Sequence, residues 1–326
     1  MALSGSYDFS QHRDSMIKDA LVSAGVISDD ETPTGEMNAS ANRLFNRMLK
    51  AWAVHGLQLW QHKDSILFLE DGKTSYDLHL TGDRWIIKDD AVETKVNGAL
   101  VATDTVVTLD TTTGMTAADV IGIETASNTM HWDTIASVDT ATTLTLTTGL
   151  AAAAADNAYC VAYTTKAPYP NRITDVYLVR YAEDGSHQPI EIISREEYYR
   201  YNNKTFEGVP NTVYFMPERI QGKLRVWGTP DADNHRLVIS AQFPVDDLDL
   251  PTSAIGFPPY WMDAIHANLT YRLYLDYGRA RGTDRYGVEP RLIEKRADKT
   301  LQEAKDFDTE FTELQFEPEV YLWHGQ

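Results

Sequence analysis

The sequence has little cysteine and no long apolar run. Cys160 is the single cysteine among 326 residues, which excludes an intrachain disulfide framework and a metal site built from several cysteines. No stretch approaches the roughly 18 apolar residues of a membrane span. The opening "MALSGSYDFSQHRDSM" also lacks the apolar core of a signal peptide. We therefore expect a protein that is made and folded in a reducing cytoplasm and has no membrane partner.

Basic residues are scarce relative to acidic ones. Lys and Arg total 29 against 48 Asp and Glu, which gives a formal net charge of −19. Binding to nucleic acid without sequence preference depends on neutralising phosphates, so this balance argues against that function. A chain this acidic repels DNA that passes close to it.

Catalytic motifs are missing as well. The sequence contains no phosphate-binding loop, no dinucleotide-binding glycine pattern, no nucleophile elbow and no H-E-x-x-H helix. Glu196 and Glu197 lie beside three tyrosines and suggest a carbohydrate-cleaving pair, but adjacent glutamates point to different sides of a helix and cannot flank one bond. We expect neither an enzyme nor a cofactor, and we interpret the tyrosines as packing or interface residues.

Histidines offer the remaining route to a metal site. His55 and His62 flank Trp60, and His79 follows along the chain. Metal ligation would need a carboxylate or a third histidine converging on them. We interpret them as turn and surface residues, so no metal is expected.

Two helices are predicted before residue 62. Ser10 is the candidate N-cap of the first helix, whose apolar residues follow at helical spacing up to Gly25. Thr32 is the candidate N-cap of the second helix, with Pro33 at its first position. Gly56 has the character of a residue that ends this second helix. Trp52 therefore lies before the helix end and Trp60 after it.

The rest of the chain indicates an α+β fold. Residues 64–80 predict two strands that form a hairpin around Asp71-Gly72, and residues 211–248 predict an antiparallel meander. Two further helices are predicted, one that begins at Pro258-Pro259 and one from about Pro290 to Phe311. Four helices from the two chain ends then form one layer beside an antiparallel β domain. We expect Trp52 and Trp60 to pack against the helix that contains Trp261.

Residues 91–163 differ in composition from their surroundings. They contain seventeen threonines and one basic residue, Lys95. Short β-branched runs recur between Gly and Asn turns, which predicts a small all-β barrel or sandwich inserted between two strands of the host domain.

The predicted organisation therefore has five parts. They are an N-terminal helical pair (1–62), a β domain (63–90 and 164–250), an inserted Thr-rich β module (91–163), a C-terminal helical pair (251–311) and an extended arm (312–326).

Two groups of cations are candidate contact sites. Arg279, Arg281 and Arg285 form a local positive patch, and they either contact phosphates or an acidic partner or complete the end of the preceding helix. Arg43 and Arg47 share one helix face, which is either a contact surface or a solvated face.

The C-terminal residues alternate apolar and acidic side chains. A free tail does not display this many large apolar groups, so the segment either folds back or docks on another chain, and docking is favoured. The residues predicted to dock are Phe311, Leu314, Phe316, Val320, Tyr321 and Trp323.

The order of these parts resembles the head-to-tail adaptor proteins of tailed bacteriophages, the tail tubular protein A and packaged-DNA-stabilisation group. "DALVSAGVISDDETPTGEMNASANRLFNRMLKAWAVHGLQLW" is similar to the family's N-terminal helix pair, which ends in a corner of the form small-W-x-x-x-G-L-x-L-W. "PPYWMDAIHANLTYRLYLDYG" resembles its long helix, and "RLIEKRADKTLQEAKDFDTEF" its closing helix. "TGMTAADVIGIETASNTMHWDTI" resembles β modules inserted in longer members.

The resemblance implies a structural virion protein in the neck, between the capsid portal and the tail. It implies a ring, expected to be dodecameric, that joins the portal protein to the tail nozzle protein. Such a ring closes the DNA channel after packaging and passes the DNA on ejection, so its contact with packaged DNA is transient. By position, the arm from Phe311 to Gln326 is the portal-binding segment.

Two other functions stay open at this stage. One is a tail-associated binding protein whose 91–163 module engages a tail fibre or a surface glycan. The other is an enzyme such as a cell-wall hydrolase. Deletion of residues 312–326 should abolish portal docking in an adaptor, deletion of 91–163 should abolish binding in the second case, and a single Glu→Gln change should abolish activity in the third.

Overall fold

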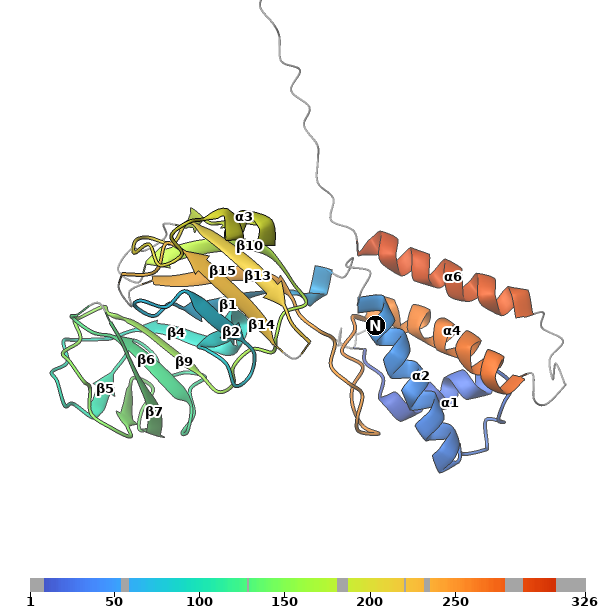
Figure 1. Cartoon of the computed structure of the whole chain (residues 1–326). Coiled ribbons are helices and arrows are strands. Elements are labelled where there is room, and N and C mark those ends of the chain that lie inside the picture. The colour runs from blue at the N-terminus through green and yellow to red at the C-terminus, as the bar shows by residue number, and fades with distance from the viewer. Residues whose placement is uncertain are drawn as a thin grey trace, which may run out of the picture. The chain divides into compact units, whose positions relative to one another are not determined.

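The computed structural model describes residues 9–53, 59–127, 129–180, 187–219, 221–231, 235–278 and 290–308. The chain divides into two compact units (Figure 1). The helical unit comprises Met1–Trp60 and Val245–Gln326, and the β unit comprises Gln61–Pro244. Helices and several largely antiparallel sheets are both present, so the predicted α+β class is confirmed.

The helical unit draws its helices from both ends of the chain. The 3-10 turn Pro259–Trp261 leads into α4, and a π-helical turn at Tyr274–Gly278 follows it, so the helix predicted after Pro258-Pro259 changes its winding at both ends. The last helix ends at Phe307 rather than Phe311. The α-helices are α1 (Arg13–Ser23), α2 (Gly35–Ala53), α4 (Met262–Leu273) and α6 (Pro290–Phe307).

The starts of the first two helices differ from their predictions. The N-cap of α1 is His12, not Ser10, and its side chain makes no capping hydrogen bond. Instead, the Arg13 and Asp14 amides donate to the carbonyls of Ser253 and Pro251. At α2 the capping hydroxyl is that of Thr34, which accepts from the Met37 amide at 3.3 Å. Tertiary contacts and a neighbouring threonine therefore replace the caps predicted from local sequence.

The core of the helical unit lies where α1, α2 and α4 meet. The largest fully buried side chains there are Trp261, Phe45, Met16 and Met48. The helix α6 contributes much less, since Ala297 and Ala304 are its buried apolar residues.

The β unit has a five-stranded and a four-stranded sheet that enclose one core. The five-stranded order is β11-β10-β15-β1-β3, and the four-stranded order is β12-β13-β14-β2. All pairs are antiparallel except β12 with β13. The strands are β1 (His62–Phe68), β2 (Ser75–Leu78), β3 (Trp85–Ile87), β10 (Arg172–Arg180), β11 (Gln188–Pro189), β12 (Glu191–Ile192), β13 (Thr212–Pro217), β14 (Gly222–Trp227) and β15 (His235–Gln242).

The hairpin predicted around Asp71-Gly72 is wrong. The strand β1 pairs with β15 and β3, whereas β2 pairs with β14 in the other sheet. The turn is present, with Gly72 at φ +70°, but it carries the chain from one sheet to the other. The predicted meander is right for β13 and β14 and wrong for β15, which is the central strand between β10 and β1.

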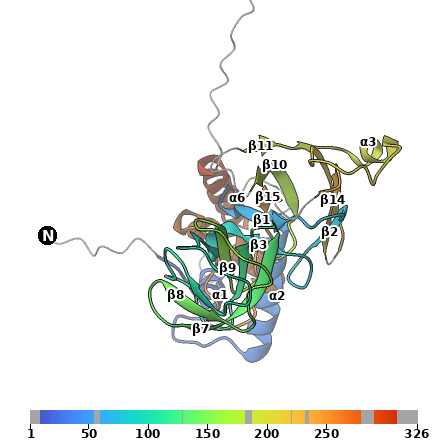
Figure 2. The same ribbon diagram turned by 90° about the vertical axis from the view of Figure 1, so that its left-hand side faces the viewer.

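The inserted segment forms a third sheet, whose strands β7, β8 and β9 are labelled in Figure 2. Its strand order is β4-β9-β6-β7-β8-β5, and its edge strands β4 and β5 are joined by an isolated bridge between Val96 and Leu109. A separate apolar core fills it. Its strands are β4 (Ala91–Lys95), β5 (Val106–Thr108), β6 (Val120–Glu124), β7 (Met130–Val138), β8 (Thr143–Leu146) and β9 (Tyr159–Tyr163).

Candidate interaction surfaces

Three residues of the predicted aromatic corner lie in one cluster. The rings of Trp52, near the end of α2, and Trp261, at the start of α4, are 5.7 Å apart between centroids, and both are buried. Phe257 lies 5.9 Å from Trp261 and 4.7 Å from Trp60. Gly56 lies outside the described residues. This cluster packs the end of α2 against α4, which is a structural role.

The predicted basic face of α2 is exposed. Arg43 and Arg47 both point to solvent, and among the described residues neither forms an ion pair. Lys50, one turn further on, differs because its ammonium donates to the Val245 carbonyl and lies 3.0 Å from an Asp247 carboxylate oxygen. Arg43 and Arg47 are therefore the cations of this face that are available to another molecule.

The remaining predicted contact residues lie outside the described part of the chain. They are Arg279, Arg281 and Arg285 of the loop before α6, and the whole of the predicted arm from Phe311 to Gln326. Their roles stay predictions.

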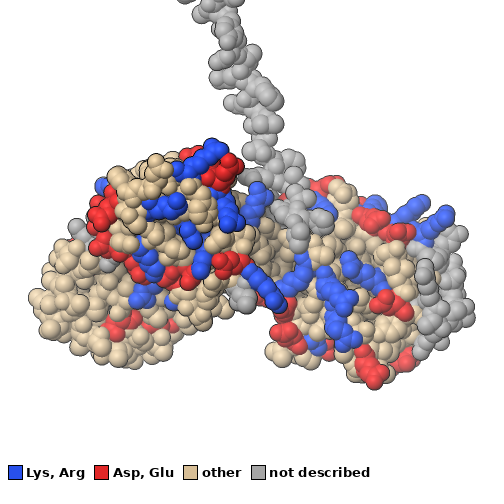
Figure 3. Space-filling model, viewed as in Figure 1, with Lys and Arg blue, Asp and Glu red and all other residues tan. Residues whose placement is uncertain are grey.

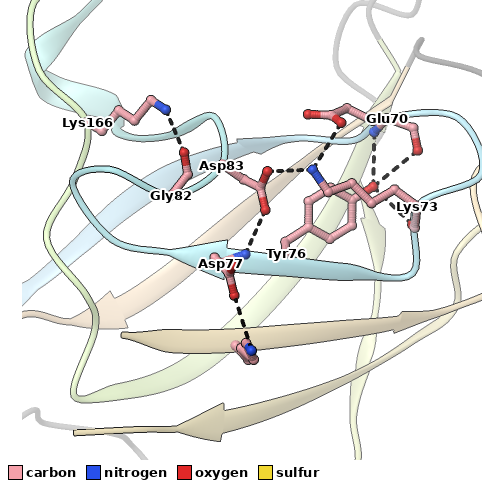
Figure 4. Close-up of polar contacts among 8 residues, drawn as sticks. Glu70, Lys73, Tyr76, Asp77, Gly82, Asp83 and Lys166 are labelled. Atoms are coloured by element: carbon pink, nitrogen blue, oxygen red, sulfur yellow. Dashed lines mark hydrogen bonds and ion pairs between the residues drawn. The ribbon is translucent and has the colours of Figure 1, made fainter. Parts of the chain in front are cut away.

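A polar network fixes the connections at both ends of β2 (Figure 4). The Lys73 ammonium lies between two carboxylates, 3.0 Å from Glu70 and 2.5 Å from Asp83. The second oxygen of Asp83 accepts from the Asp77 amide at 2.7 Å. Burial lowers the pKa of Lys73, but the hydrogen bonds to Asp83 and Glu70 outweigh this effect and leave the pKa above its ordinary value. The network holds Lys73 charged.

A second lysine closes the same loop. The Lys166 ammonium donates to the Gly82 carbonyl at 2.6 Å. Burial and the nearby charge of Arg84 lower the pKa of Lys166. Both lysines bond to groups of the loop in Figure 4, so we interpret the network as a clamp on this loop.

The inserted module is joined to the host sheets by aromatic packing. Phe68 of β1 meets Trp132 of β7 edge-on with ring centroids 4.9 Å apart. The guanidinium of Arg84 lies 4.2 Å from the centre of the Trp132 ring. Tyr159, Val161 and Tyr163 of β9 belong to the same apolar cluster as Ile66 and Ile86 of the host. The module and the host therefore share a packed interface.

Charged groups border this interface. The Arg236 guanidinium lies 4.1 Å from the centre of the Tyr159 ring and 3.2 Å from a Glu93 oxygen, and the Tyr159 hydroxyl donates to the same carboxylate at 2.9 Å. Glu124 is buried and accepts from the Tyr159 amide at 3.2 Å. Burial raises the pKa of Glu124, and that hydrogen bond and the charge of Arg236 oppose the shift only in part.

The glutamate pair considered as a catalytic candidate serves α3 (Arg195–Arg200) instead. Glu197 forms a capping box with Ser194, in which the Ser194 amide donates to the Glu197 carboxylate at 2.8 Å. Glu196 lies 2.5 Å from Arg200 across one helical turn. Both carboxylates are engaged locally, so they do not form an acid–base pair across a substrate site.

The tyrosines beside that pair belong to an aromatic surface. Tyr198 is buried and packs against Tyr214, whereas Tyr199 is 48 % exposed. Tyr201 stacks on Trp227 with centroids 4.4 Å apart and planes within 9°. Sequence reasoning suggested the interface character of the tyrosines but missed the cations around them, because Arg225 comes from β14 and the pairing of distant segments brings it there.

The described residues of the helical unit form a groove of moderate size. Its volume is about 280 Å³, and α1, α4 and α6 line it with both apolar and polar side chains. Ser23 and His266 are in contact at one side, with 3.2 Å between the hydroxyl oxygen and Nε2. Arg296, also in the lining, is paired with Asp263 at 3.2 Å.

The described residues can be judged for metal binding and for membrane crossing. Among them, no group of three or more His, Cys, Asp or Glu side chains is arranged to hold a metal ion. Of the helices they form, none has the length and apolar character needed to cross a bilayer.

Comparisons with known proteins give little further information. No protein-family model matches the chain, and no curated protein matches it. Among solved structures, VP17, a capsid protein of bacteriophage P23-77, aligns over 56 % of this chain and 71 % of that chain, with 14 % identity and a TM-score of 0.17. A TM-score this low supports no conclusion about a shared fold or function.

Proposed function

We propose that the protein is a structural virion component, a head-to-tail adaptor that joins the portal protein to the tail nozzle of a tailed bacteriophage. In this role, copies of the chain form a ring, expected to be dodecameric. The ring closes the DNA channel after packaging and passes the DNA on ejection. The net charge of −19 suits a channel that must release DNA rather than bind it.

The observation that carries the proposal is which segments of the chain form the helical unit. Its helices come from both ends of the chain, with the entire β unit inserted between α2 and α4, and Trp52 packs on Trp261. This is the arrangement implied by the family resemblance of the N-terminal helix pair and of the helix that begins with Pro-Pro-Tyr-Trp.

Surface features agree with a role in assembly. Phe307, the last residue of α6, is 71 % exposed, and its ring lies 4.7 Å from that of Tyr260. An exposed aromatic pair that lies shortly before the predicted arm favours contact with another protein. Arg43 and Arg47 add two exposed cations on α2 that form no ion pair among the described residues and are suited to an acidic partner or, transiently, to DNA in the channel.

The test is mass photometry of the purified protein, alone and mixed with its cognate portal ring. We expect the portal to gain the mass of about one copy per portal subunit, as a ring matched to the portal requires. A variant that ends at Phe311 should lose this binding, because it lacks residues 312–326. A full-length Lys63→Glu variant, altered at an exposed site on β1, is the matched surface control. A portal mass that stays unchanged with the full-length protein would overturn the proposal.

A further inference from the structure

Three cations surround Tyr199 of α3, while the two glutamates of this helix are engaged in its capping box and with Arg200. Arg195, Lys204 and Arg225 lie 5.6, 5.3 and 6.0 Å from the centre of the Tyr199 ring. Within the described ranges none of the three forms an ion pair, and the Nε of Arg225 is buried without a hydrogen-bond acceptor. The three cations face one ring without an ion partner among the described residues, so carboxylates brought by another molecule would stabilise them.

Exposed aromatic side chains accompany these cations. Tyr199 is 48 % and Phe206 51 % exposed. The loop that carries Phe206 is held in place because its ring stacks on Trp227 with centroids 5.8 Å apart, and its carbonyl accepts from the Thr229 amide at 2.7 Å. A surface that is already ordered loses little conformational entropy when a partner binds. We call Arg195, Tyr199, Lys204, Phe206 and Arg225 the α3 patch.

The inserted module carries acidic and apolar groups that complement the cations and aromatic rings of the α3 patch. Residues 91–163 contain eight acidic residues and one basic residue, so their formal charge is −8 + 1 = −7. Val101, Val106 and Val138 are 63, 53 and 36 % exposed on it. Asp104 lies between the first two, and Asp139 follows the third. Val106 pairs with Thr145, whose hydroxyl donates to Asp139, and we call Val101, Asp104, Val106 and Asp139 the module tip.

Hydrogen bonds within the module tip fix its acidic groups. The Asp139 carboxylate accepts from the hydroxyls of Ser137 and Thr145, each at 2.7 Å, and these bonds lower the pKa of Asp139. Asp104 accepts from the Val101 amide at 2.9 Å, which places that carboxylate beside an exposed valine. The module tip therefore presents carboxylates among apolar groups, the counterpart of cations among aromatic rings.

The two surfaces lie at opposite ends of the β unit. In Figure 1 α3 is at the top of this unit and β5 and β7 are at the bottom, and Figure 2 separates α3 from β7 and β8 in the same way. Figure 3 shows blue and red side chains close together at the top of this unit, near α3, and few charged side chains on the lower part of the face in view. Complementary surfaces at opposite ends of one body produce head-to-tail contacts, which form rings or open chains rather than two-fold dimers.

We infer that the α3 patch of one copy binds the module tip of a neighbouring copy. This contact gives the module a role in self-assembly and makes the ring contact heterologous. The pairing itself follows from the two surfaces, and only the closure of the ring rests on the proposed function. Association without the portal can therefore be tested separately from portal binding.

The experiment is sedimentation of the full-length protein over rising concentration, without the portal, using variants of either surface. Arg195→Glu with Lys204→Glu reverses two charges of the α3 patch, and a glutamate at the first position of α3 also suits its helix dipole. Val106→Lys places a cation on the module tip in an exposed edge strand, where lysine is tolerated. Each variant should weaken self-association about tenfold or more, equivalent to ~1.4 kcal/mol. Lys63→Glu and Asp64→Lys, both on exposed positions of β1, are the matched controls.

Mixing the two variants distinguishes head-to-tail association from general repulsion. Each variant keeps one intact surface, so the mixture should form a one-to-one heterodimer and grow no further. Zero-length cross-linking between isotope-labelled copies should join Lys204 to Asp104 or Asp139. The inference is overturned if the wild type stays monomeric and free of cross-links at its highest soluble concentration. It is also overturned if either variant associates as the wild type does, or if the mixture forms no heterodimer.

Discussion

The guanidinium of Arg84 lies 4.2 Å from the centre of the Trp132 ring, so a cation from the host sheets covers an aromatic side chain of the inserted module. Phe68 meets the same ring at its edge, 4.9 Å away. The module is thus attached by packing as well as by its two chain connections. Its deletion would expose Phe68, Ile66 and Ile86, which are buried in the interface. Point variants of the module therefore test its function more cleanly than removal of residues 91–163.

Truncation of Trp132 should loosen this attachment. Trp132→Ala is expected to lower the free energy of unfolding by ~3 kcal/mol, because a large aromatic side chain leaves a packed interface. Arg84→Ala should cost less in the Trp132→Ala background than in the wild type, with a coupling of about 1 kcal/mol from the cation–π contact. Urea unfolding of the four proteins of this cycle measures both quantities. Equal costs of Arg84→Ala in the two backgrounds would exclude the contact as a stabilising interaction.

Gly82 should not tolerate a side chain. A Cβ built there would lie 2.1 Å from the Asp77 carbonyl oxygen, inside the loop that Lys166 and Asp83 clamp. Gly82→Ala is therefore expected to destabilise the β unit by ~1–3 kcal/mol, the usual range for a forced backbone shift. Gly256→Ala is the control, because a Cβ at that position meets nothing within 4 Å. Thermal melts of both variants make the comparison, and equal melting temperatures would contradict the close approach at Gly82.

Glu124 should make stability depend on pH in the weakly acidic range. Burial raises its folded-state pKa above the ordinary value of 4.5, so the folded protein binds this proton more tightly than the unfolded chain. The contribution of this group to the free energy of unfolding falls as pH rises from 4.5 through the raised pKa. Glu124→Gln removes this dependence and keeps an acceptor for the Tyr159 amide.

The measurement for Glu124 is urea unfolding of the wild type and Glu124→Gln from pH 4.5 to neutral pH. The stability of the variant relative to the wild type should increase as pH rises. Glu36→Gln, at the exposed start of α2, controls for the loss of a carboxylate. A difference between Glu124→Gln and wild type that stays constant with pH would contradict a raised pKa.

Local sequence patterns predicted the elements better than their partners. Asp71-Gly72 is a turn, as its residue types indicate, but the strands beside it join different sheets. Pairing was decided by burial: the run from Ser65 to Phe68 is buried throughout, which suits a central strand between β15 and β3. A period-two pattern says which face of a strand is buried and does not say which distant strand lies beside it.

The same limit applies to the surfaces. The apolar stripe of α2 and the Trp261 helix could be predicted because they depend on local periodicity. The α3 patch could be predicted only in part, because Arg225 on β14 reaches the tyrosines of α3 through the long-range pairing of β13 and β14 beside that helix. In the sequence, basic residues alternate with aromatic ones from Arg195 to Phe206, and this local signal was present.

Arg43 and Arg47 should matter for binding rather than for folding. Both are exposed and make no ion pair among the described residues, so Arg43→Glu with Arg47→Glu should change the free energy of unfolding by no more than ~0.5 kcal/mol. Under the proposed function, the double variant should bind the portal ring more weakly, and the difference should shrink at high salt. Lys50→Met is the comparison, because Lys50 is already paired with Asp247. If the double variant binds the portal as tightly as the wild type at low salt, this face of α2 is a solvated face and not a contact surface.

The aromatic cluster of the helical unit should depend most on its buried tryptophan. Trp52 is 5 % exposed and lies 5.7 Å from Trp261, whereas Trp60 is half-buried and contacts Phe257. Trp52→Ala is expected to cost ~3–5 kcal/mol because it opens a cavity between α2 and α4, and Trp60→Ala should cost clearly less. Circular dichroism during thermal unfolding ranks the two variants. If Trp60→Ala proved the more damaging, the main contact of the corner would lie at the 3-10 turn Leu59–Gln61 rather than at the end of α2.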